Sequence, residues 1–349
     1  GTAIVGTVSG TDITFGTAVV FASVNSSYNS IVFDSSNNKV VIAYKDSSIT
    51  HSRAIVGTVS GTSISFGSPT SFISNNANPV RMTYTESGKV VIVYRDGSNS
   101  YYAYAIVGTV SGTSISFGSQ TQFNNSNTSD LDVTYDTNSS KVVVAYEDNA
   151  NSSYATAIVG TVSGTSISFG SEVVIGGACY DIVATFDSTN NKVVVAYVDS
   201  GNSSYGTAAV GTVSGTSISF GTPVVFESAD TNYISIAFDS NAERVSIKYA
   251  DQGDSGKGTV IDGVVSGTSI TFGTPYVFKS SQIYYAEEGS TFDSNAGKVV
   301  LVYRAAATGE AVVITSGGES TNLTTDNYIG ITGEAISNAA TGKINIIGG

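Results

Sequence analysis

The stretch Gly57-Thr-Val-Ser-Gly-Thr-Ser-Ile-Ser-Phe-Gly67 decides the fold, because the chain repeats it. The same residues return at 108–118, 160–170 and 211–221, and near-copies stand at 6–16 and 263–273. Successive copies begin 51 or 52 residues apart. A fixed period of this length is typical of a protein built from one repeated structural unit.

Each copy predicts a tight β-hairpin. In the copy at 54–67, two apolar runs flank Ser60 and Gly61, and a two-residue link that contains glycine favours a hairpin turn. We therefore expect the cross-strand pairs Val59–Thr62, Gly57–Ile64 and Ile55–Phe66. Gly57 leaves room beside the Ile64 side chain.

A second hairpin precedes each copy and is clearest at 181–197. Two apolar runs, 181–186 and 192–197, flank the polar turn 187–191. Their apolar residues do not alternate with polar ones, so both faces should be buried. The unit is thus four short antiparallel strands, and a four-stranded sheet repeated at this period indicates a β-propeller blade. The strand before Phe-Asp should be innermost and Ser-Ile-Ser-Phe outermost.

The copies predict an all-β, six-bladed propeller over residues 1–315. Residues 3–8 and 11–16 are outer strands without an inner pair, whereas 286–292 and 298–303 are an inner pair at the other end. We expect these to join, so that both termini complete the last blade. Residues 311–314 also align with the third strand of that blade, so either they or residues 3–8 are left as a surplus strand. Residues 316–349 are expected to be a short C-terminal extension.

The composition restricts the possible partners. The formal net charge of −13 disfavours nucleic-acid binding, and no apolar run is long enough to span a membrane. Cys179 is the only cysteine and forms no internal disulfide. Charged residues make up 12% of a chain rich in Gly, Ser, Thr and Asn, a composition more common in extracellular adhesins and fibres than in cytosolic enzymes.

The C-terminal segment resembles a module of tail-fibre and related structural proteins of bacterial viruses, many of them marine. The resemblance rests on Leu323-Thr-Thr-Asp-Asn-Tyr-Ile-Gly330 and on the apolar end Ile344-Asn-Ile-Ile-Gly348. The Gly-Thr-Val-Ser-Gly-Thr-Ser-Ile-Ser-Phe-Gly repeat also looks like repeats in such proteins and in bacterial surface proteins. The resemblance implies a virion or cell-surface location and leaves the ligand open.

Two series of aspartates recur with the repeat. Asp34, Asp136, Asp187, Asp239 and Asp293 open the polar turn of the inner hairpin, where Asp accepts hydrogen bonds from its own turn. Asp46, Asp96, Asp148, Asp199 and Asp251 follow the second strand, on the face that also carries the blade crossovers. The second series could cap its own loops, bind sugar hydroxyls or hold Ca²⁺, which prefers oxygen ligands.

The loops after the second series differ from blade to blade and carry tyrosines, namely Tyr101, Tyr102, Tyr154 and Tyr205. Aromatic rings stack on sugars and lose little entropy on binding. Divergent loops on a fixed scaffold favour a binding role. We therefore expect these tyrosines and the second aspartate series to bind cell-surface glycans.

Two other functions remain open. The surplus strand or the tail could join subunits into a filament or fibre. The many carboxylates leave a glycosidase formally possible. With His51 as the only histidine, we expect neither a Ser-His-Asp triad nor a zinc site within one chain, and we favour a non-enzymatic adhesin.

Overall fold

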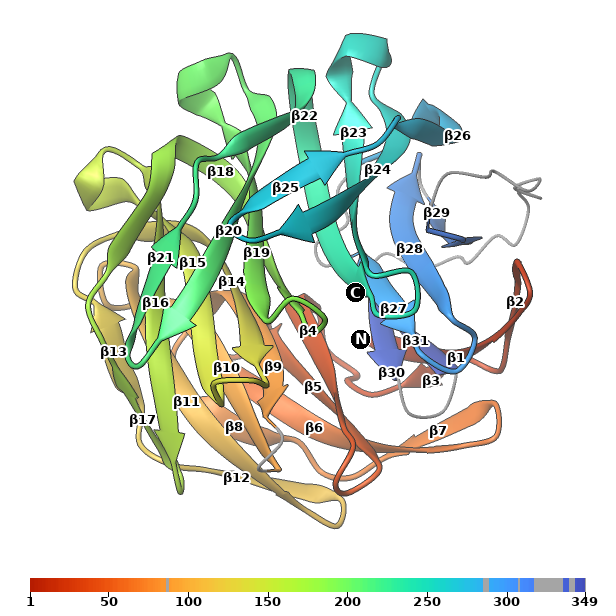
Figure 1. The fold of residues 1–349 in the computed structure, drawn as a ribbon. Helices are drawn as coiled ribbons and strands as arrows, with labels where there is room; N and C mark the ends of the chain where they lie inside the picture. Colours follow the sequence, from red (N-terminus) through yellow and green to blue (C-terminus); the bar gives the residue numbers. More distant parts are fainter. Residues whose placement is uncertain (86–87, 285–288, 307, 317–334, 339–342, 349) are drawn as a thin grey trace.

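In a computed structural model of the protein, small antiparallel sheets stand side by side around a centre (Figure 1). The structure describes residues 1–85, 88–284, 289–306, 308–316, 335–338 and 343–348. The described strands form seven blades, and the innermost strands of successive blades contact one another all the way round, from β4 to β30 and back to β4. The chain is therefore an all-β propeller. The prediction of six blades is wrong.

We number the blades 1–6 in chain order from β4 and call the seventh the closing blade. The innermost strands are β4 (Ser26–Asp34), β9 (Ala77–Thr85), β14 (Thr128–Asp136), β18 (Val173–Asp187), β22 (Val224–Asp239), β27 (Ser290–Asp293) and β30 (Ala335–Asn338). The second strands are β5 (Lys39–Asp46), β10 (Lys89–Asp96), β15 (Lys141–Asp148), β19 (Lys192–Asp199), β23 (Arg244–Asp251), β28 (Lys298–Ala305) and β31 (Lys343–Gly348).

The repeated stretch supplies the outer half of the blades, as the sequence predicts. The third strands are β1 (Thr2–Ser9), β6 (His51–Ser60), β11 (Tyr102–Ser111), β16 (Tyr154–Ser163), β20 (Tyr205–Ser214), β24 (Lys257–Ser266) and β29 (Thr308–Ile314). The outermost strands are β2 (Asp12–Phe15), β7 (Ser63–Phe66), β12 (Ser114–Phe117), β17 (Ser166–Phe169), β21 (Ser217–Phe220) and β25 (Ser269–Phe272). The predicted order of strands within a blade is confirmed.

After each outermost strand the chain pairs once more with the third strand before it crosses to the next blade. These continuations are β3 (Val19–Val20), β8 (Thr70–Ile73), β13 (Thr121–Asn124) and β26 (Tyr276–Gln282). In blades 3 and 4 the same role falls to the first residues of β18 and β22, which then become the innermost strand of the next blade. These two long strands link blades 3, 4 and 5 into one hydrogen-bonded ladder.

The closing blade corrects the predicted closure. β1 pairs with β31, from Thr2 opposite Gly348 to Thr7 opposite Lys343, and β31 pairs with β30. Residues 311–314 lie in β29, which is the third strand of blade 6 and pairs with β28. They are therefore not surplus, and part of the expected extension 316–349 belongs to the ring. Both termini do complete one blade, but its inner strands are 335–338 and 343–348. The strands predicted at 286–292 and 298–303 belong to blade 6 as far as their residues are described, and 286–288 lie outside the described residues.

The outer hairpin is shifted from its predicted pairing. Val59 lies opposite Ile64 and Gly57 opposite Phe66, so the two-residue loop is Gly61-Thr62. Gly61 has φ +60°, which glycine adopts without strain at the first loop position of a type II′ turn. A side chain at position 57 would meet the Phe66 ring at 2.9 Å and the Ile64 side chain at 3.0 Å, so the glycine makes room for both.

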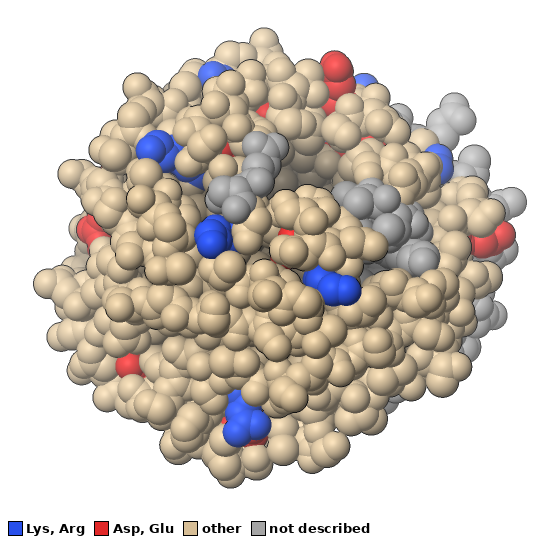
Figure 2. Space-filling view, turned by 90° about the horizontal axis from the view of Figure 1, so that it is seen from below, with Lys and Arg blue, Asp and Glu red and all other residues tan. Residues whose placement is uncertain are grey.

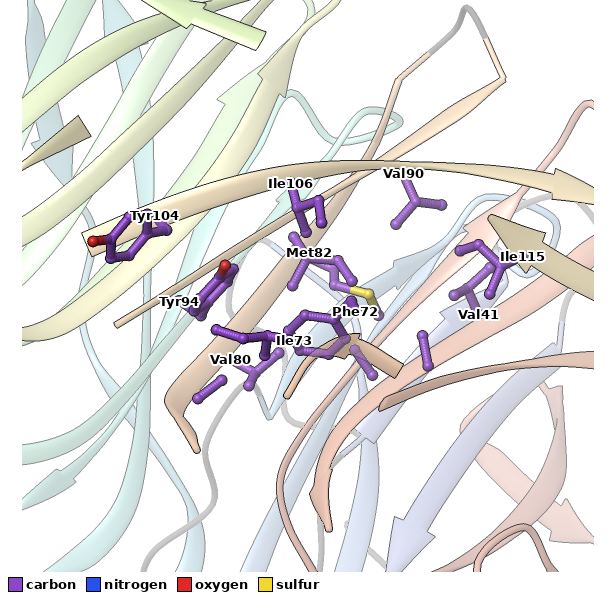
Figure 3. Close-up of a cluster of buried hydrophobic side chains, with 14 of the residues drawn as sticks. Val41, Phe72, Ile73, Val80, Met82, Val90, Tyr94, Tyr104, Ile106 and Ile115 are labelled. Atoms are coloured by element: carbon purple, nitrogen blue, oxygen red, sulfur yellow. The ribbon is translucent and has the colours of Figure 1, made fainter. Parts of the chain in front are cut away.

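The faces of neighbouring blades pack together to form the core. Figure 3 shows the cluster between blades 1 and 2, in which Phe72 of β8 lies beside Met82 of β9, and Val41 of β5 lies beside Ile115 of β12. The Phe72 ring packs 5.6 Å from the Tyr94 ring, centroid to centroid. The same Phe–Tyr pair recurs at 5.3 Å in blade 1 and 5.4 Å in blade 5. Repetition of this contact in five of the blades explains why their strands are so similar.

Carboxylates near the centre tie neighbouring blades to each other. Asp130 of β14 accepts a hydrogen bond from the Asp181 N–H (2.9 Å), and Asp181 of β18 accepts one from the Tyr233 N–H (2.6 Å). Asp132 accepts another from the Ala184 N–H (2.8 Å). Burial raises the pKa of Asp132 to about 6, although the nearby Arg81 charge opposes the rise. The central carboxylates therefore bond the main chain of the next blade.

Lys248 of β23 is buried where blades 1–4 and 6 have alanine or valine. Its Nζ donates a 3.0 Å hydrogen bond to the Val302 carbonyl of blade 6. Burial lowers the pKa of Lys248 to about 7, although the Asp181 charge opposes this. The folded state thus binds fewer protons than the unfolded chain between pH 7 and 10.5.

Stability is therefore expected to rise with pH from about 7 to about 10, because a lowered lysine pKa penalises folding most at low pH. In Lys248→Met, the increase in the free energy of unfolding between pH 7 and pH 10 should be smaller by on the order of 2 kcal/mol. The control Lys192→Met, which lies beside the inner hairpin turn of blade 4, should show the same increase as the native protein. Urea unfolding at pH 7 and pH 10 measures the difference. An unchanged rise in Lys248→Met would contradict the assignment.

Candidate functional site

One side of the ring carries the loops between second and third strands together with the crossovers, as the sequence predicts. Three of these loops contain short 3₁₀ turns, η1 (Asn149–Asn151), η2 (Ser200–Asn202) and η3 (Gln252–Asp254), which stand along the upper edge of Figure 1. We call this side the loop face. The opposite side, where the hairpin turns lie, is the turn face.

The first aspartate series closes its own turns on the turn face. Asp34 accepts a 3.0 Å hydrogen bond from the Asn37 N–H, and Asp187 accepts two of 2.9 Å from Thr189 and Asn190. Asp136, Asp239 and Asp293 bind their turns in the same way. In blade 2, the Thr85 hydroxyl takes this place. The prediction for this series is confirmed.

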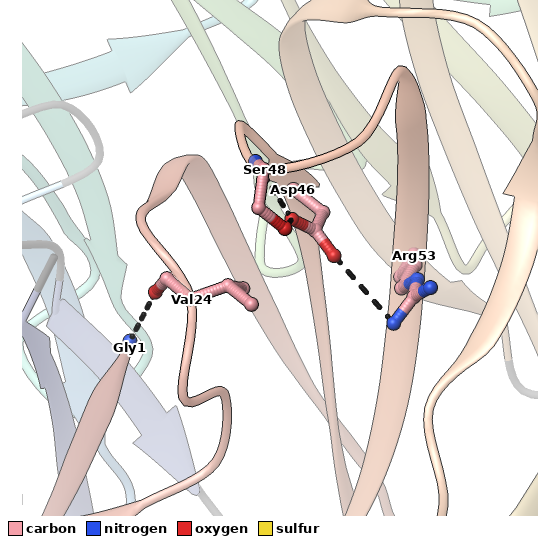
Figure 4. A network of polar contacts seen from close by, with 5 residues as sticks. All are labelled: Gly1, Val24, Asp46, Ser48 and Arg53. Atoms are coloured by element: carbon pink, nitrogen blue, oxygen red, sulfur yellow. Dashed lines mark hydrogen bonds and ion pairs between the residues drawn. The ribbon is translucent and has the colours of Figure 1, made fainter.

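The second aspartate series is engaged inside its loops. Asp46 is buried, and its Oδ1 accepts hydrogen bonds from the Ser48 N–H (3.0 Å) and hydroxyl (2.6 Å), as Figure 4 shows. Its Oδ2 lies 3.5 Å from Arg53 Nη1. Burial alone would raise the pKa of Asp46, but these Ser48 bonds and the Arg53 charge hold that pKa below its ordinary value.

Three other members of this series also cap their loops. Asp96 accepts from the Ser98 N–H (2.9 Å), Asp148 from the Ala150 N–H (3.1 Å) and Asp251 from the Asp254 N–H (3.2 Å). Asp199 precedes η2 without such a bond. No three His, Cys, Asp or Glu side chains of the described residues are grouped to hold a metal. The geometry thus favours loop capping and lends no support to a Ca²⁺ site.

The predicted tyrosines divide into two kinds. Tyr102, Tyr154 and Tyr205 begin third strands and lie opposite Asp96, Asp148 and Asp199. Tyr154 is 39% exposed, whereas Tyr102 and Tyr205 are half-buried. Tyr101 stands outside this series, one residue before β11, with φ +59°. It is 43% exposed, so its ring is accessible to a ligand on the loop face.

Arg95 holds the Tyr101 ring in place. The guanidinium carbon lies 4.8 Å from the ring centroid, within the range of a cation–π contact. Arg95 Nη1 also donates a 2.6 Å hydrogen bond to the Thr128 carbonyl of blade 3, and its Nε donates to the Asn78 carbonyl. The arginine therefore bridges two blades and gives the exposed ring a fixed orientation.

An acidic side chain faces Arg95 across the seam between blades 2 and 3. Glu147 occupies in β15 the position that Arg95 occupies in β10, and the two charges interact. Burial raises the pKa of Glu147, and the Asp130 charge adds to the rise, whereas a Ser153 hydrogen bond and Arg95 oppose it. We call Arg95, Tyr101 and Glu147 the seam site. Sequence analysis missed Arg95 and Glu147, although their position varies strongly between blades.

The seam site combines groups suited to a polyhydroxylated ligand. The Tyr101 ring offers a surface for stacking, and Arg95 and Glu147 offer a hydrogen-bond donor and acceptors beside it. Ser98, Asn99 and Ser100 of the same loop are exposed. Among the described loops, only the one in blade 2 places a guanidinium against an exposed loop tyrosine.

Comparison with known proteins shows a likeness in fold alone. No family model and no curated protein matches the chain. The BP39L lectin from Burkholderia pseudomallei has a TM-score of 0.69 at 9% identity, over 90% of this chain and 89% of that one. A putative 6-phosphogluconolactonase from Bacteroides uniformis gives 0.62 at 10% identity, over 89% and 91% of the two chains. A Lactobacillus plantarum protein gives 0.58 at 12%, over 89% and 91%. The viral resemblance stays a prediction.

The described residues include no helix with the length and apolar character that crossing a membrane requires.

Proposed function

We propose that this protein is a non-enzymatic carbohydrate-binding propeller whose seam site binds a neutral glycan. The observation that carries the proposal is the exposed Tyr101 ring backed by Arg95 at 4.8 Å. Binding to a ring that is already fixed costs less conformational entropy than binding to a mobile one. The lectin among the similar folds is consistent with this class of ligand.

The remaining expectations form part of the same proposal. Display on a virion fibre or cell surface would make the protein an adhesin. We do not propose self-association through a surplus strand, because residues 311–314 pair with β28 of the same chain. A glycosidase would need two carboxyl groups placed across a sugar linkage, whereas four of the five loop aspartates cap their own loops.

Tyr101→Ala is expected to weaken glycan binding about tenfold, because stacking on one aromatic ring contributes roughly 1–1.5 kcal/mol. A glycan array with the native protein identifies the ligand, and calorimetry then measures Kd for each variant. Arg95→Lys keeps the charge but loses the planar contact with Tyr101, and should weaken binding severalfold.

The matched control is Arg244→Ala, which removes an arginine from the turn face. Its Kd should equal that of the native protein. The proposal fails if the array gives no hit or if Tyr101→Ala binds as tightly as the native protein. Release of reducing sugar from a bound glycan would instead show a hydrolase.

A further inference from the structure

The turn face carries a ring of basic side chains with one member per blade. Each second strand begins with a basic residue just after the inner hairpin turn: Lys39, Lys89, Lys141, Lys192, Arg244, Lys298 and, in β31, Lys343. These are seven of the 15 Lys and Arg residues of the chain. We call the first six, whose side chains are described, the basic ring.

The ring is not neutralised by ion pairs. All six side chains are half-exposed, and none makes an ion pair among the described residues. The basic residues of the loop face differ: Arg53 and Lys257 pair with aspartates, and Arg95 and Arg304 lie over tyrosine rings. The cations of the turn face therefore remain available to an external partner.

Neighbouring hydroxyls hold several of these ammonium groups in place. Lys89 Nζ donates to Thr109 Oγ1 at 2.9 Å, and Lys141 Nζ donates to Thr161 Oγ1 at 2.8 Å. A hydroxyl acceptor fixes the direction of the ammonium group, leaves two of its protons free and does not cancel its charge. The aspartates opposite the ring, such as Asp136, are buried and already accept N–H bonds from their turns.

The turn face also presents hydroxyl groups at the tips of the outer hairpins. The outer hairpin tips read Ser-Gly-Thr-Ser at 60–63, 111–114, 163–166, 214–217 and 266–269, and all these residues are exposed. Figure 2, which views the molecule from below, shows Lys and Arg lying apart on a largely uncharged face. The tips carry no aromatic or aliphatic side chain that could anchor in a bilayer.

We infer that the turn face is a second binding surface, which takes a carboxylated linear polysaccharide. Ammonium groups repeated from blade to blade can pair with carboxylates repeated along a sugar chain, and the Ser and Thr hydroxyls of the hairpin tips can bind sugar hydroxyls. Contacts repeated over several blades supply avidity from pairs that are individually weak. This surface is separate from the seam site and takes a ligand of different charge.

The test uses polygalacturonate as the probe, immobilised on a sensor at low and moderate salt. The native protein should bind, and binding should weaken as salt rises. Lys141→Gln/Lys192→Gln should weaken binding about tenfold, at about threefold for each lost ion pair. The control Lys45→Gln/Lys257→Gln removes the same charge from the loop face and should stay within twofold of the native protein.

Three results would overturn the inference: no binding by the native protein, equal loss in both double variants, or binding to anionic phosphatidylglycerol vesicles in place of polygalacturonate. Tyr101→Ala should bind polygalacturonate like the native protein. Failure of the seam site and failure of the turn face are therefore observed separately.

Discussion

A chain that ends at residue 334 is expected to lose its cooperative thermal transition or to melt more than 10 °C below the full chain. The deletion removes β30 and β31, which provide the inner half of the closing blade and the pairing partner of β1. The edge of β1 then lies open, and β27 and β4 lose their contacts with β30. An exposed strand edge destabilises the fold and promotes aggregation.

The measurement is calorimetry combined with size-exclusion chromatography. A synthetic peptide of residues 335–349, added in excess, should raise the melting temperature of the shortened chain, whereas a scrambled peptide should not. If the shortened chain melts like the full one, 286–303 and 3–16 could close the ring by themselves, and the six-bladed arrangement would return.

Gly118→Ala is expected to cost about 2–3 kcal/mol of stability, because overpacking a rigid contact forces the backbone to move. A Cβ at Gly118 would stand 1.9 Å from the Thr165 carbonyl oxygen in the hairpin loop of the next blade. The same Gly–Thr contact recurs at Gly16, Gly67, Gly170 and Gly221, which explains why the repeat keeps both residues.

The chain provides a matched control in Gly273. Its N–H donates a 2.9 Å hydrogen bond to the Asp262 carbonyl, as the Gly118 N–H does at 3.0 Å to the Val107 carbonyl. A Cβ there meets nothing nearer than 3.7 Å, because the contact from a next hairpin loop is absent among the described residues. Gly273→Ala should therefore unfold within 0.5 kcal/mol or so of the native protein. Equal losses in the two variants, measured by urea unfolding, would show that the cost is not the contact between blades.

The sequence predicts the structural features that recur in nearly every copy of the repeat, but it does not predict the strands formed by residues outside the repeat. The strand order and the turn aspartates follow from patterns present in almost every copy. The closing blade does not, because residues 335–348 lack the repeated stretch. Its one signal is Gly342-Lys343, which matches Gly297-Lys298 at the start of β28.

The candidate site shows the same division. The loop aspartates recur in five blades, and four of the five cap their own loops, so recurrence here indicates a role in the fold. Tyr101 and Arg95 break the repeat, and a departure from an otherwise repeated pattern indicates function better than the pattern itself. Sequence spacing could not bring them together with Glu147, because the contact depends on how two blades pack.

β1 pairs with β31 of the same molecule. The same strand pairing could also form between β1 of one molecule and β31 of another. Whether the pairing within one molecule or between molecules dominates depends on the effective concentration of the two chain ends compared with the protein concentration. Ends held within one chain meet at an effective concentration of order millimolar, so at micromolar protein the self-closed monomer dominates. As the protein concentration approaches that value, exchange of the terminal strands between copies should yield dimers and chains without any new interface.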